Sequence, residues 1–243
     1  MFDPKDYSSY GENLSDKYDE WYGSFDGRII ERIEEMAEGG PVFELGIGTG
    51  RIAIPLSQRG LQVAGLDASP SMLEKLKEKK GGEQVAVKVG NFASFETEKK
   101  FDVVFIIFNT IFALQSQEEQ VNCFKCVEKI LNPGGKFIVE AFVPDPGRFP
   151  GGQAVRTIDL NGENVKLECS KHDPAKQTVM TQTVDLSGEG IKLYPLKIRY
   201  IWPSEMDLMA KLAGLELKER WSSWGKDAFS ASSKMHVSIY EKV

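Results

Sequence analysis

The sequence is poor in the side chains on which metal, disulfide and acid–base chemistry usually depend. Its 243 residues include two histidines, His172 and His236, and three cysteines, which are too few for a disulfide framework. Cys123 and Cys126 form one C-x-x-C inside an amphipathic helical pattern, and no second pair completes a zinc site. We therefore expect cysteines packed in a helix, and no bound metal.

Excess positive charge and long apolar runs are also missing. Lys and Arg number 30 against 36 Asp and Glu, a formal net charge of -6, so the overall field repels nucleic acid. No window approaches the length of about 18 apolar residues that a membrane-spanning helix needs, and residues 1–6 are polar and acidic. These properties predict a cytoplasmic protein with no nucleic-acid partner and no membrane partner.

The first part of the chain alternates short apolar runs with amphipathic segments. We predict strands at 42–45, 62–66, 85–89, 101–107 and 136–142, and helices at 25–38, 51–59, 69–80 and 116–131. Ser69 and Ser116 are placed as N-caps, and 132–135 as a turn. The strand–helix alternation predicts an α/β fold with a doubly wound parallel sheet.

The pattern changes after Pro144. Apolar and polar residues alternate at 154–160, 165–170, 178–186 and 191–202, with turn signals between them, which predicts an inserted antiparallel sheet. A helix capped by Ser204 and ended by Gly214, then strands at 215–221 and 235–240, return the chain to the main sheet. We expect three parts: an aromatic N-terminal segment at 1–24, the α/β domain at 25–144 and 203–243, and the insertion at 145–202.

The first predicted strand ends in Glu44-Leu45-Gly46-Ile47-Gly48-Thr49-Gly50, a turn with glycine at alternate positions. Such a turn lets the backbone approach a ligand closely. A dinucleotide-binding loop places its third glycine one residue later, where this chain has Arg51. Asp67 ends the next strand, where a carboxylate can accept hydrogen bonds from two ribose hydroxyls. Together these features resemble the class I S-adenosylmethionine-dependent methyltransferases, which implies a Rossmann-like seven-stranded sheet and that cofactor.

The resemblance also implies which residues surround the cofactor. The glycine turn lies under the methionine and ribose, Asp67 holds the ribose, and Met72 packs near the adenine. Asn91 and Phe92 flank the adenine, although many relatives carry Asp at the position of Asn91. Arg51 either pairs with the methionine carboxylate or is a surface helix arginine. The full expected set is Tyr22, Glu44, Gly46, Gly48, Gly50, Arg51, Asp67, Ala68, Met72, Asn91, Phe92 and Phe108.

Aromatic residues are concentrated near the N-terminus, where Tyr18-Asp19-Glu20-Trp21-Tyr22 resembles a Y-D-x-x-Y segment that covers the cofactor in many small-molecule methyltransferases. Aromatic faces attract a sulfonium and exclude water, so we predict a lid that orders with the cofactor. The alternative is an aromatic contact that fixes the first helix to the core. The expected substrate contacts are Tyr18, Trp21, Asn109 and Trp202, and Asn109 is equally well explained as a turn residue.

Neither histidine lies in a recognisable catalytic motif. We expect His172, beside an Asp-Pro turn, to be exposed and His236 to be packed in the last strand. With Tyr22 and Asn109 they are the weak candidates for a catalytic role. The scarcity of general bases favours an amine acceptor, because an unprotonated amine needs no dedicated base, whereas an alcohol benefits from one.

The preferred function is methyl transfer to a nitrogen, and with less support to an oxygen, of a small molecule or short peptide. Residues 109–112, 117–119, 132–135 and 206–216 resemble peptide N-terminal methyltransferases such as that of cypemycin, and the layout is similar to the amino-sugar N-methyltransferases of natural-product pathways. The alternatives are a cyclisation or rearrangement on the same fold and cofactor, a non-catalytic binding protein, and an NAD-dependent oxidoreductase. We expect a monomer or a homodimer.

Overall fold

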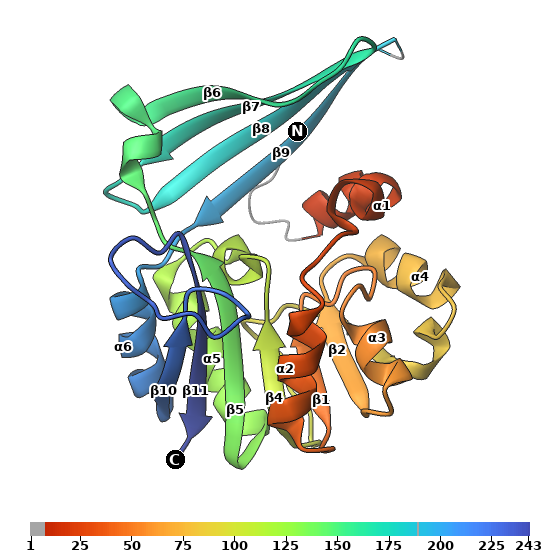
Figure 1. Ribbon diagram of the computed structural model, residues 1–243, viewed down its shortest axis with the longest axis vertical. Coiled ribbons are helices and arrows are strands. Elements are labelled where there is room, and N and C mark those ends of the chain that lie inside the picture. The colour runs from red at the N-terminus through yellow and green to blue at the C-terminus, as the bar shows by residue number, and fades with distance from the viewer. Residues whose placement is uncertain (1–7, 189) are drawn as a thin grey trace.

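The computed structural model describes residues 8–188 and 190–243, which form a seven-stranded sheet and a separate four-stranded sheet (Figure 1). Residues 1–7 of the expected lid, including Tyr7, and Glu189 of an expected turn lie outside the described residues. Within the described ranges no helix has the length and apolar character needed to cross a membrane.

The seven-stranded sheet has the order β10-β11-β5-β4-β1-β2-β3. Strands β1 to β5 pair in parallel, and β11 is antiparallel to both of its neighbours, β5 and β10. This arrangement confirms the predicted doubly wound sheet. Its strands are β1 (Val42–Leu45), β2 (Val63–Asp67), β3 (Ala86–Val89), β4 (Phe101–Ile106), β5 (Leu131–Phe142), β10 (Leu215–Trp221) and β11 (Met235–Lys242).

Helices cover both faces of this sheet, which is why β4 is apolar at nearly every position. Val104 and Ile106 of β4 belong to the hydrophobic cluster that contains the buried residues of α5 and α6, whereas Val103 and Phe105 belong to the cluster of α2 and α3. All four side chains are fully buried. The helices are α2 (Arg28–Ala37), α3 (Ala53–Gln58), α4 (Pro70–Glu78), α5 (Gln117–Ile130) and α6 (Pro203–Ala213).

The predicted helix boundaries hold for α4 and α5 but not at the start of α6. The side-chain oxygens of Ser69 and Ser116 cap their helices by accepting the amides of Met72 and Glu119. The cap of α6 is instead Trp202, without a side-chain hydrogen bond, and the prediction of Ser204 as the cap was wrong. Pro203 occupies the first helical position, where its fixed φ suits the helix and its missing N–H costs nothing, so the helix begins two residues earlier than predicted.

Strand β5 also begins earlier than predicted. Leu131 pairs with Phe101, and the ladder resumes only at Lys136 opposite Val103, so the residues 132–135 expected as a turn lie within the strand as an irregularity. The predicted cysteine helix is α5, in which Cys123 is buried and Cys126 is half-buried.

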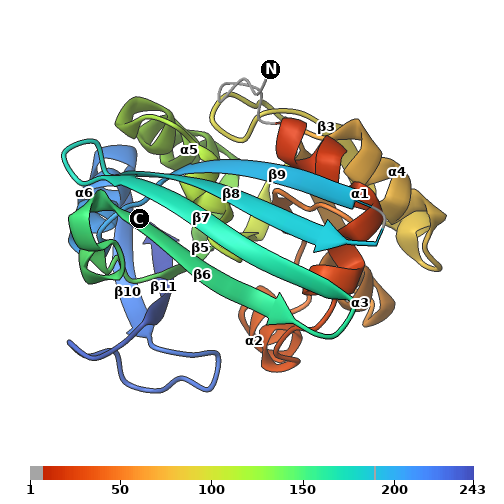
Figure 2. The ribbon, with the colours of Figure 1, turned by 90° about the horizontal axis from the view of Figure 1, so that it is seen from above.

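The inserted sheet has the order β6-β7-β8-β9 and is antiparallel throughout, as predicted. It lies over one end of the main sheet, with one broad face turned toward that sheet and the other uncovered in the view from above (Figures 1 and 2). Its last strand ends at Arg199, before the expected Trp202. The strands are β6 (Gln153–Leu160), β7 (Asn164–Asp173), β8 (Thr178–Ser187) and β9 (Gly190–Arg199).

Candidate functional site

The glycine turn between β1 and α3 adopts left-handed backbone conformations that favour glycine. The φ angles of Gly46, Gly48 and Gly50 are 69°, 54° and 76°. A Cβ at Gly46 would collide with the methyl group of Thr110, and one at Gly50 with Leu76, whereas a Cβ at Gly48 would meet nothing within 4 Å. Gly46 and Gly50 therefore serve close packing, and Gly48 presents bare backbone to open space that a ligand can fill.

Asp67 connects the ends of β1 and β2. Its Oδ2 accepts the amide of Gly48 at 2.8 Å and its Oδ1 accepts the amide of Ser69 at 2.9 Å. Burial raises the pKa of Asp67, and the amide donors oppose that shift. Each carboxylate oxygen retains a further lone pair, so the carboxylate can hold the glycine turn and still accept hydroxyl donors. Half-buried Ala68 follows it directly.

Glu44 is the second acidic group beside the turn. The residue is 4 % exposed, and its Oε2 is buried with no hydrogen-bond partner among the described residues. Burial raises the pKa of Glu44 well above its ordinary value, with the nearby charge of Arg51 acting in the opposite direction. An orphaned buried carboxylate oxygen is costly, and a cationic or N–H donor of a ligand would satisfy it.

The residues expected around an adenine are largely packed into the protein. Met72 and Phe92 are 4 % and 6 % exposed. The side-chain oxygen of Asn91 accepts the amide of Ala93 at 2.8 Å, so this carbonyl is already engaged locally rather than standing ready for an adenine amino group. Their contacts with the cofactor stay a prediction.

Helix α1 (Ser9–Tyr22) lies over α4 and the glycine turn, and three acids on it form what we call the α1 seam. Glu12 accepts the hydroxyl of Ser69 at 2.6 Å. Asp16 pairs with Lys75 at 3.1 Å, and Asp19 pairs with Lys79 at 2.6 Å. Asp19 also accepts the hydroxyl of Thr49, inside the glycine turn, at 2.7 Å. The seam therefore fixes the N-terminal segment directly onto the expected cofactor site.

Arg51 links the end of α1 to the turn that follows β4. Its guanidinium lies 3.8 Å from the centre of the Phe108 ring and donates to the backbone oxygen of Tyr22. It is half-buried rather than a free surface arginine. Burial raises the pKa of Tyr18 to about 12, although Arg51 acts in the opposite direction, so this phenol is neutral at ordinary pH.

The turn after β4 holds two consecutive non-glycine residues in the left-handed region, Phe108 at φ 62° and Asn109 at φ 63°. Such conformations cost roughly 1–3 kcal/mol each and persist only where neighbours hold them. Strand β5 supplies that support. Glu140 accepts the Phe108 amide through Oε2 at 3.1 Å and the Asn109 amide through its backbone oxygen at 3.2 Å. The Asn109 side-chain oxygen accepts the Phe142 amide at 2.7 Å, so Asn109 stabilises the turn by bonding it to β5.

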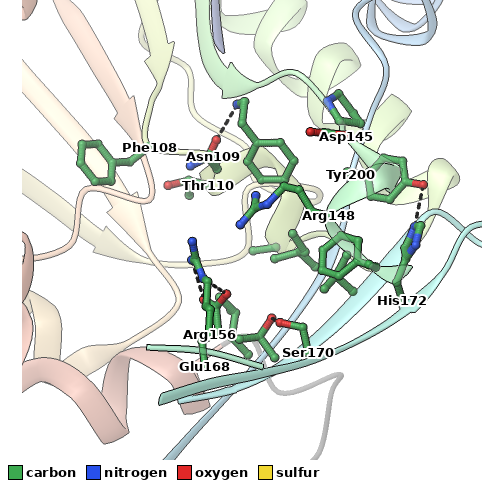
Figure 3. A pocket seen from close by; sticks show the side chains of 18 of the residues that line it. Phe108, Asn109, Thr110, Asp145, Arg148, Arg156, Glu168, Ser170, His172 and Tyr200 are labelled. Carbon is green, nitrogen blue, oxygen red and sulfur yellow. Dashed lines mark hydrogen bonds and ion pairs between the residues drawn. The ribbon is translucent and has the colours of Figure 1, made fainter. Parts of the chain in front are cut away.

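A cavity of about 400 Å³ lies between this turn, α1 and the inner face of the inserted sheet (Figure 3). We call it the acceptor cavity. Tyr18 and Tyr22 line it from α1, Phe108 and Asn109 from the turn, and Thr110 brings it next to Gly46. Its position beyond the carboxyl ends of the parallel strands is where ligands bind in open α/β sheets. Its remaining lining comes from Ala113, Phe142, Pro144, Asp145, Pro146, Arg148, Phe149, Arg156, Glu168, Ser170, His172, Val179, Thr181, Leu196, Ile198 and Tyr200.

His172 lies inside this cavity, and the prediction that it is exposed was wrong. It is 8 % exposed, and its Nε2 lies 3.0 Å from the hydroxyl of Tyr200. Its ring also lies 4.8 Å from that of Phe149, centre to centre. The Asp-Pro turn suggested exposure, but residues far along the chain cover the ring. Figure 3 shows the His172–Tyr200 pair at one end of the cavity and an Arg156–Glu168 ion pair, 2.6 Å apart, on its sheet wall.

Three other candidates lie outside the cavity lining. Trp21 packs edge-on against Tyr194 of β9, which fits the alternative of an aromatic contact that fixes the first helix. Trp202 is 38 % exposed and caps α6, so Tyr200, two residues earlier, faces the cavity in its place. His236 is fully buried in β11, as expected, and burial lowers its pKa to about 4.

Sequence reasoning missed several cavity residues. Arg156 and Glu168 pair across β6 and β7, and Phe149 comes from a loop without a recognisable motif. The period of two in the inserted strands could have identified the inner-face residues, but not which face is inner. Over residues 8–188 and 190–243, no three His, Cys, Asp or Glu side chains are grouped as metal ligands.

Comparison with known proteins identifies the family. Residues 42–135 match a family model described as a methyltransferase domain. The CcbJ methyltransferase from Streptomyces caelestis has a solved structure with 41 % sequence identity and a TM-score of 0.92, and the match covers 100 % of both chains. The cypemycin N-terminal methyltransferase from a Streptomyces species is 27 % identical over 206 residues, 84 % of each chain.

A third similarity concerns the fold alone. The amino pentose methyltransferase CalS10 from Micromonospora echinaspora, solved with S-adenosylmethionine bound, has 17 % identity and a TM-score of 0.69 over 92 % of this chain and 95 % of its own. The glycine turn with bare backbone at Gly48, the buried Glu44 and half-buried Asp67 beside it and the full-length similarity to CcbJ agree. The chain belongs to the class I S-adenosylmethionine-dependent methyltransferases, with S-adenosylmethionine as its cofactor.

Proposed function

We propose that this enzyme methylates a nitrogen atom of a small molecule or short peptide held in the acceptor cavity. The observation that carries the proposal is that the cavity begins at Thr110, which packs directly on Gly46 of the glycine turn. A volume of about 400 Å³ suits a small molecule or the end of a peptide better than a folded protein.

We assign the cofactor to the open space above Gly48. When bound, S-adenosylmethionine supplies an electrophilic methyl group on a sulfonium. The unpartnered oxygen of Glu44 would receive the ammonium of the methionine part, and the remaining lone pairs of Asp67 would receive the ribose hydroxyls. Arg51 would keep its contact with the Phe108 ring, close to the methionine carboxylate.

The wall nearest the glycine turn supports a nitrogen acceptor. It is formed by the aromatic rings of Tyr18, Tyr22 and Phe108, which exclude water and tolerate positive charge. A neutral amine brings its own lone pair, so the wall has to position and desolvate it rather than deprotonate it. The name of the cypemycin enzyme, an N-terminal methyltransferase, points to the same acceptor atom.

We assign the N-terminal segment to closure over the cofactor and the insertion to recognition of the acceptor. The N-terminal segment, residues 1–24, acts as the lid, because α1 is fixed to the glycine turn through Asp19. The insertion, residues 145–202, selects the acceptor, because its inner face supplies His172, Glu168 and Arg156 to the cavity. The His172–Tyr200 pair orients the acceptor at the end of the cavity.

The acceptor atom is tested by supplying S-adenosylmethionine with matched pairs of compounds that differ only in an amine or a hydroxyl group. We expect S-adenosylhomocysteine and an N-methylated product in equal amounts from the amines. Equal or faster turnover of the hydroxyl compounds would refute the nitrogen assignment. Consumption of an acceptor compound without formation of S-adenosylhomocysteine would instead favour a cyclisation or rearrangement.

The cofactor assignment is tested by calorimetry with S-adenosylhomocysteine. Asp67→Ala should weaken binding by about 2–4 kcal/mol, because two charge-assisted hydrogen bonds are lost. Gly48→Val should weaken it because a branched side chain would fill the open space and strain a positive φ. Asp159→Ala, on the distant insertion, is the control and should bind normally. Unchanged affinity in both site variants would contradict the assignment.

A further inference from the structure

The polar side chains on the sheet wall of the acceptor cavity pair with one another. Arg156 of β6 donates to both carboxylate oxygens of Glu168 on β7, at 2.6 and 3.0 Å. Further along the same wall, the hydroxyls of Ser170 and Thr181 lie 3.3 Å apart. The negative charge of Glu168 is therefore already matched by a guanidinium of its own wall.

Arg148 is the cation that these contacts leave unmatched. It lines the cavity from the loop between β5 and β6, and no carboxylate of residues 8–188 and 190–243 forms an ion pair with it. Its guanidinium lies 5.8 Å from the centre of the Phe149 ring. Figure 3 shows the guanidinium groups of Arg148 and Arg156 both pointing into the cavity. The cavity therefore presents a positive charge that no contacting carboxylate of the described residues neutralises.

The loop that carries Arg148 is held by its own hydrogen bonds. Asp145 accepts the amide of Gly147 through Oδ1 at 3.1 Å, and its backbone oxygen accepts the amide of Arg148 at 3.2 Å. The next residue, Phe149, packs its ring on that of His172, 4.8 Å away from centre to centre. The Asp145 carboxylate thus serves the loop, and a guanidinium presented by a bonded loop loses less entropy when it binds a ligand.

The surroundings of Arg148 favour an anionic ligand group. Arg148 is exposed to solvent, and a ligand that fills the cavity would cover it. Removing a charge from water is costly unless the ligand supplies an opposite charge within hydrogen-bond reach. Apolar side chains nearby exclude water and so strengthen that attraction. They are those of Phe142, Val179, Leu196 and Ile198.

The geometry and charge of this site favour a carboxylate over a phosphate. The planar fork of an arginine matches the two oxygens of a carboxylate and can bind them through two parallel N–H bonds. One unmatched guanidinium balances the single charge of that group. A phosphate monoester carries about -1.5 to -2 at neutral pH, and its extra charge would share the cavity with the carboxylates of Asp145 and Glu168, which repel it.

The cavity thus has an aromatic wall for the amine and a separate place for an anion. We propose that the acceptor carries a carboxylate in addition to its amine, and that Arg148 binds this carboxylate. The inference rests on the proposed function, since it takes the cavity as the acceptor site. It narrows the acceptors to amino acids and to short peptides with a free carboxylate.

The first test measures recognition of the anion without methyl transfer. The protein loaded with S-adenosylhomocysteine is titrated in a calorimeter with benzoate, with its neutral isostere benzamide and with phenyl phosphate. Benzoate should bind at least ~10-fold more tightly than benzamide, because its hydrogen bonds to Arg148 are charge-assisted. Arg148→Gln should remove this preference, and Arg59→Gln, at a guanidinium of the α3 C-terminus that pairs with Glu34, should keep it.

Three results of this titration would overturn the proposal. They are failure of benzoate to bind better than benzamide, a preference for benzoate that survives in Arg148→Gln, and tighter binding of phenyl phosphate than of benzoate.

The second test uses methyl transfer. Each amine that the enzyme accepts is compared as its free acid and as its carboxamide. Arg148→Gln should raise KM for the acids at least ~10-fold and leave both KM for the carboxamides and the affinity for S-adenosylhomocysteine unchanged. Arg148→Lys should recover part of the loss, because an ammonium keeps the charge without the fork. An equal change of KM for acids and carboxamides would overturn the proposal.

The same assay separates this inference from the assignment of the acceptor atom. Turnover of hydroxy acids in place of amino acids would refute the nitrogen acceptor, yet a KM that still depends on Arg148 would support the carboxylate site. Turnover of amines with no dependence on Arg148 would refute the carboxylate site alone.

Discussion

The α1 seam should control cofactor affinity through one carboxylate, that of Asp19. This residue pairs with Lys79 at 2.6 Å and accepts the hydroxyl of Thr49 at 2.7 Å. The ion pair is partly exposed, with 44 % of the Asp19 side chain and 35 % of the Lys79 side chain accessible. Solvent screening therefore reduces its contribution to the stability of the closed position to about 0.5 kcal/mol. The hydrogen bond to Thr49 is partly buried and adds about 1 kcal/mol. Asp19→Ala should therefore disfavour the closed position of α1 by about 1.5 kcal/mol.

If the cofactor is retained by the closed lid, this loss becomes about a 10-fold weaker affinity for S-adenosylhomocysteine. The assay is calorimetry at low and high salt. Raising the ionic strength from about 0.1 to about 1 M shortens the screening length from ~10 to ~3 Å, so the unmodified protein should lose affinity and Asp19→Ala should lose less. Glu20→Ala is the matched control, because among the described residues Glu20 forms its ion pair with Lys17 of the same helix.

The pH dependence of the seam follows from the same contacts. Burial alone would raise the pKa of Asp19, but the hydrogen bonds from Lys79 and Thr49 outweigh it, and the pKa is lowered. A lowered carboxyl pKa contributes stability above the ordinary value of about 4 that is lost as the pH falls through the lower, folded value. The seam should therefore be insensitive to pH near neutrality. Wild-type affinity in Asp19→Ala at low salt would refute the reasoning.

Three further predictions concern the buried groups of the site. Burial raises the pKa of the Glu44 carboxyl, so the protonated carboxyl favours the folded state at low pH, and this stability is lost as the pH rises through the raised pKa. Glu44→Gln should therefore raise the melting temperature at neutral pH and flatten the pH dependence of that temperature, yet weaken cofactor binding. Burial likewise raises the pKa of Tyr18 to about 12, so this phenol should stay protonated near pH 10. Ultraviolet titration should therefore detect the same number of tyrosinates near pH 10 in the unmodified chain and in Tyr18→Phe. Tyr200→Phe removes the bond to His172 and should raise KM for the acceptor several-fold while S-adenosylhomocysteine binds normally; a loss confined to cofactor affinity would contradict the assignment of this pair.

The sheet and the glycine turn could be predicted because local signals specify them. An apolar run such as that of β4 requires cover on both faces, and a turn like that of Gly48 needs glycine wherever it occurs. Ser69 caps its helix as predicted because no stronger local signal competes, whereas at Ser204 the neighbouring Pro203 decides the boundary.

The acceptor cavity was less predictable because it depends on contacts between distant segments. His172 is buried by Phe149 and Tyr200, which neither its own strand nor its adjacent turn reveals. Trp202 was the predicted contact, but β9 ends at Arg199, so Tyr200, two residues earlier, faces the cavity in its place. Asn91 and Asn109 lie in the turns that follow β3 and β4, but only the folded structure shows that their side-chain oxygens accept the amides of Ala93 and of Phe142 in β5.

The alternation along β6–β9 restricts how this protein can evolve. Each strand carries residues that line the cavity and residues of the opposite face at successive positions, as Leu196 and Pro195 do on β9. A single-residue insertion or deletion within such a strand would exchange the two sets, placing the aliphatic side chains in the cavity and the polar wall outside. New acceptors must therefore arise through point substitutions on the inner face or changes in the connecting loops, and length variation among descendants should be confined to the turns between these strands.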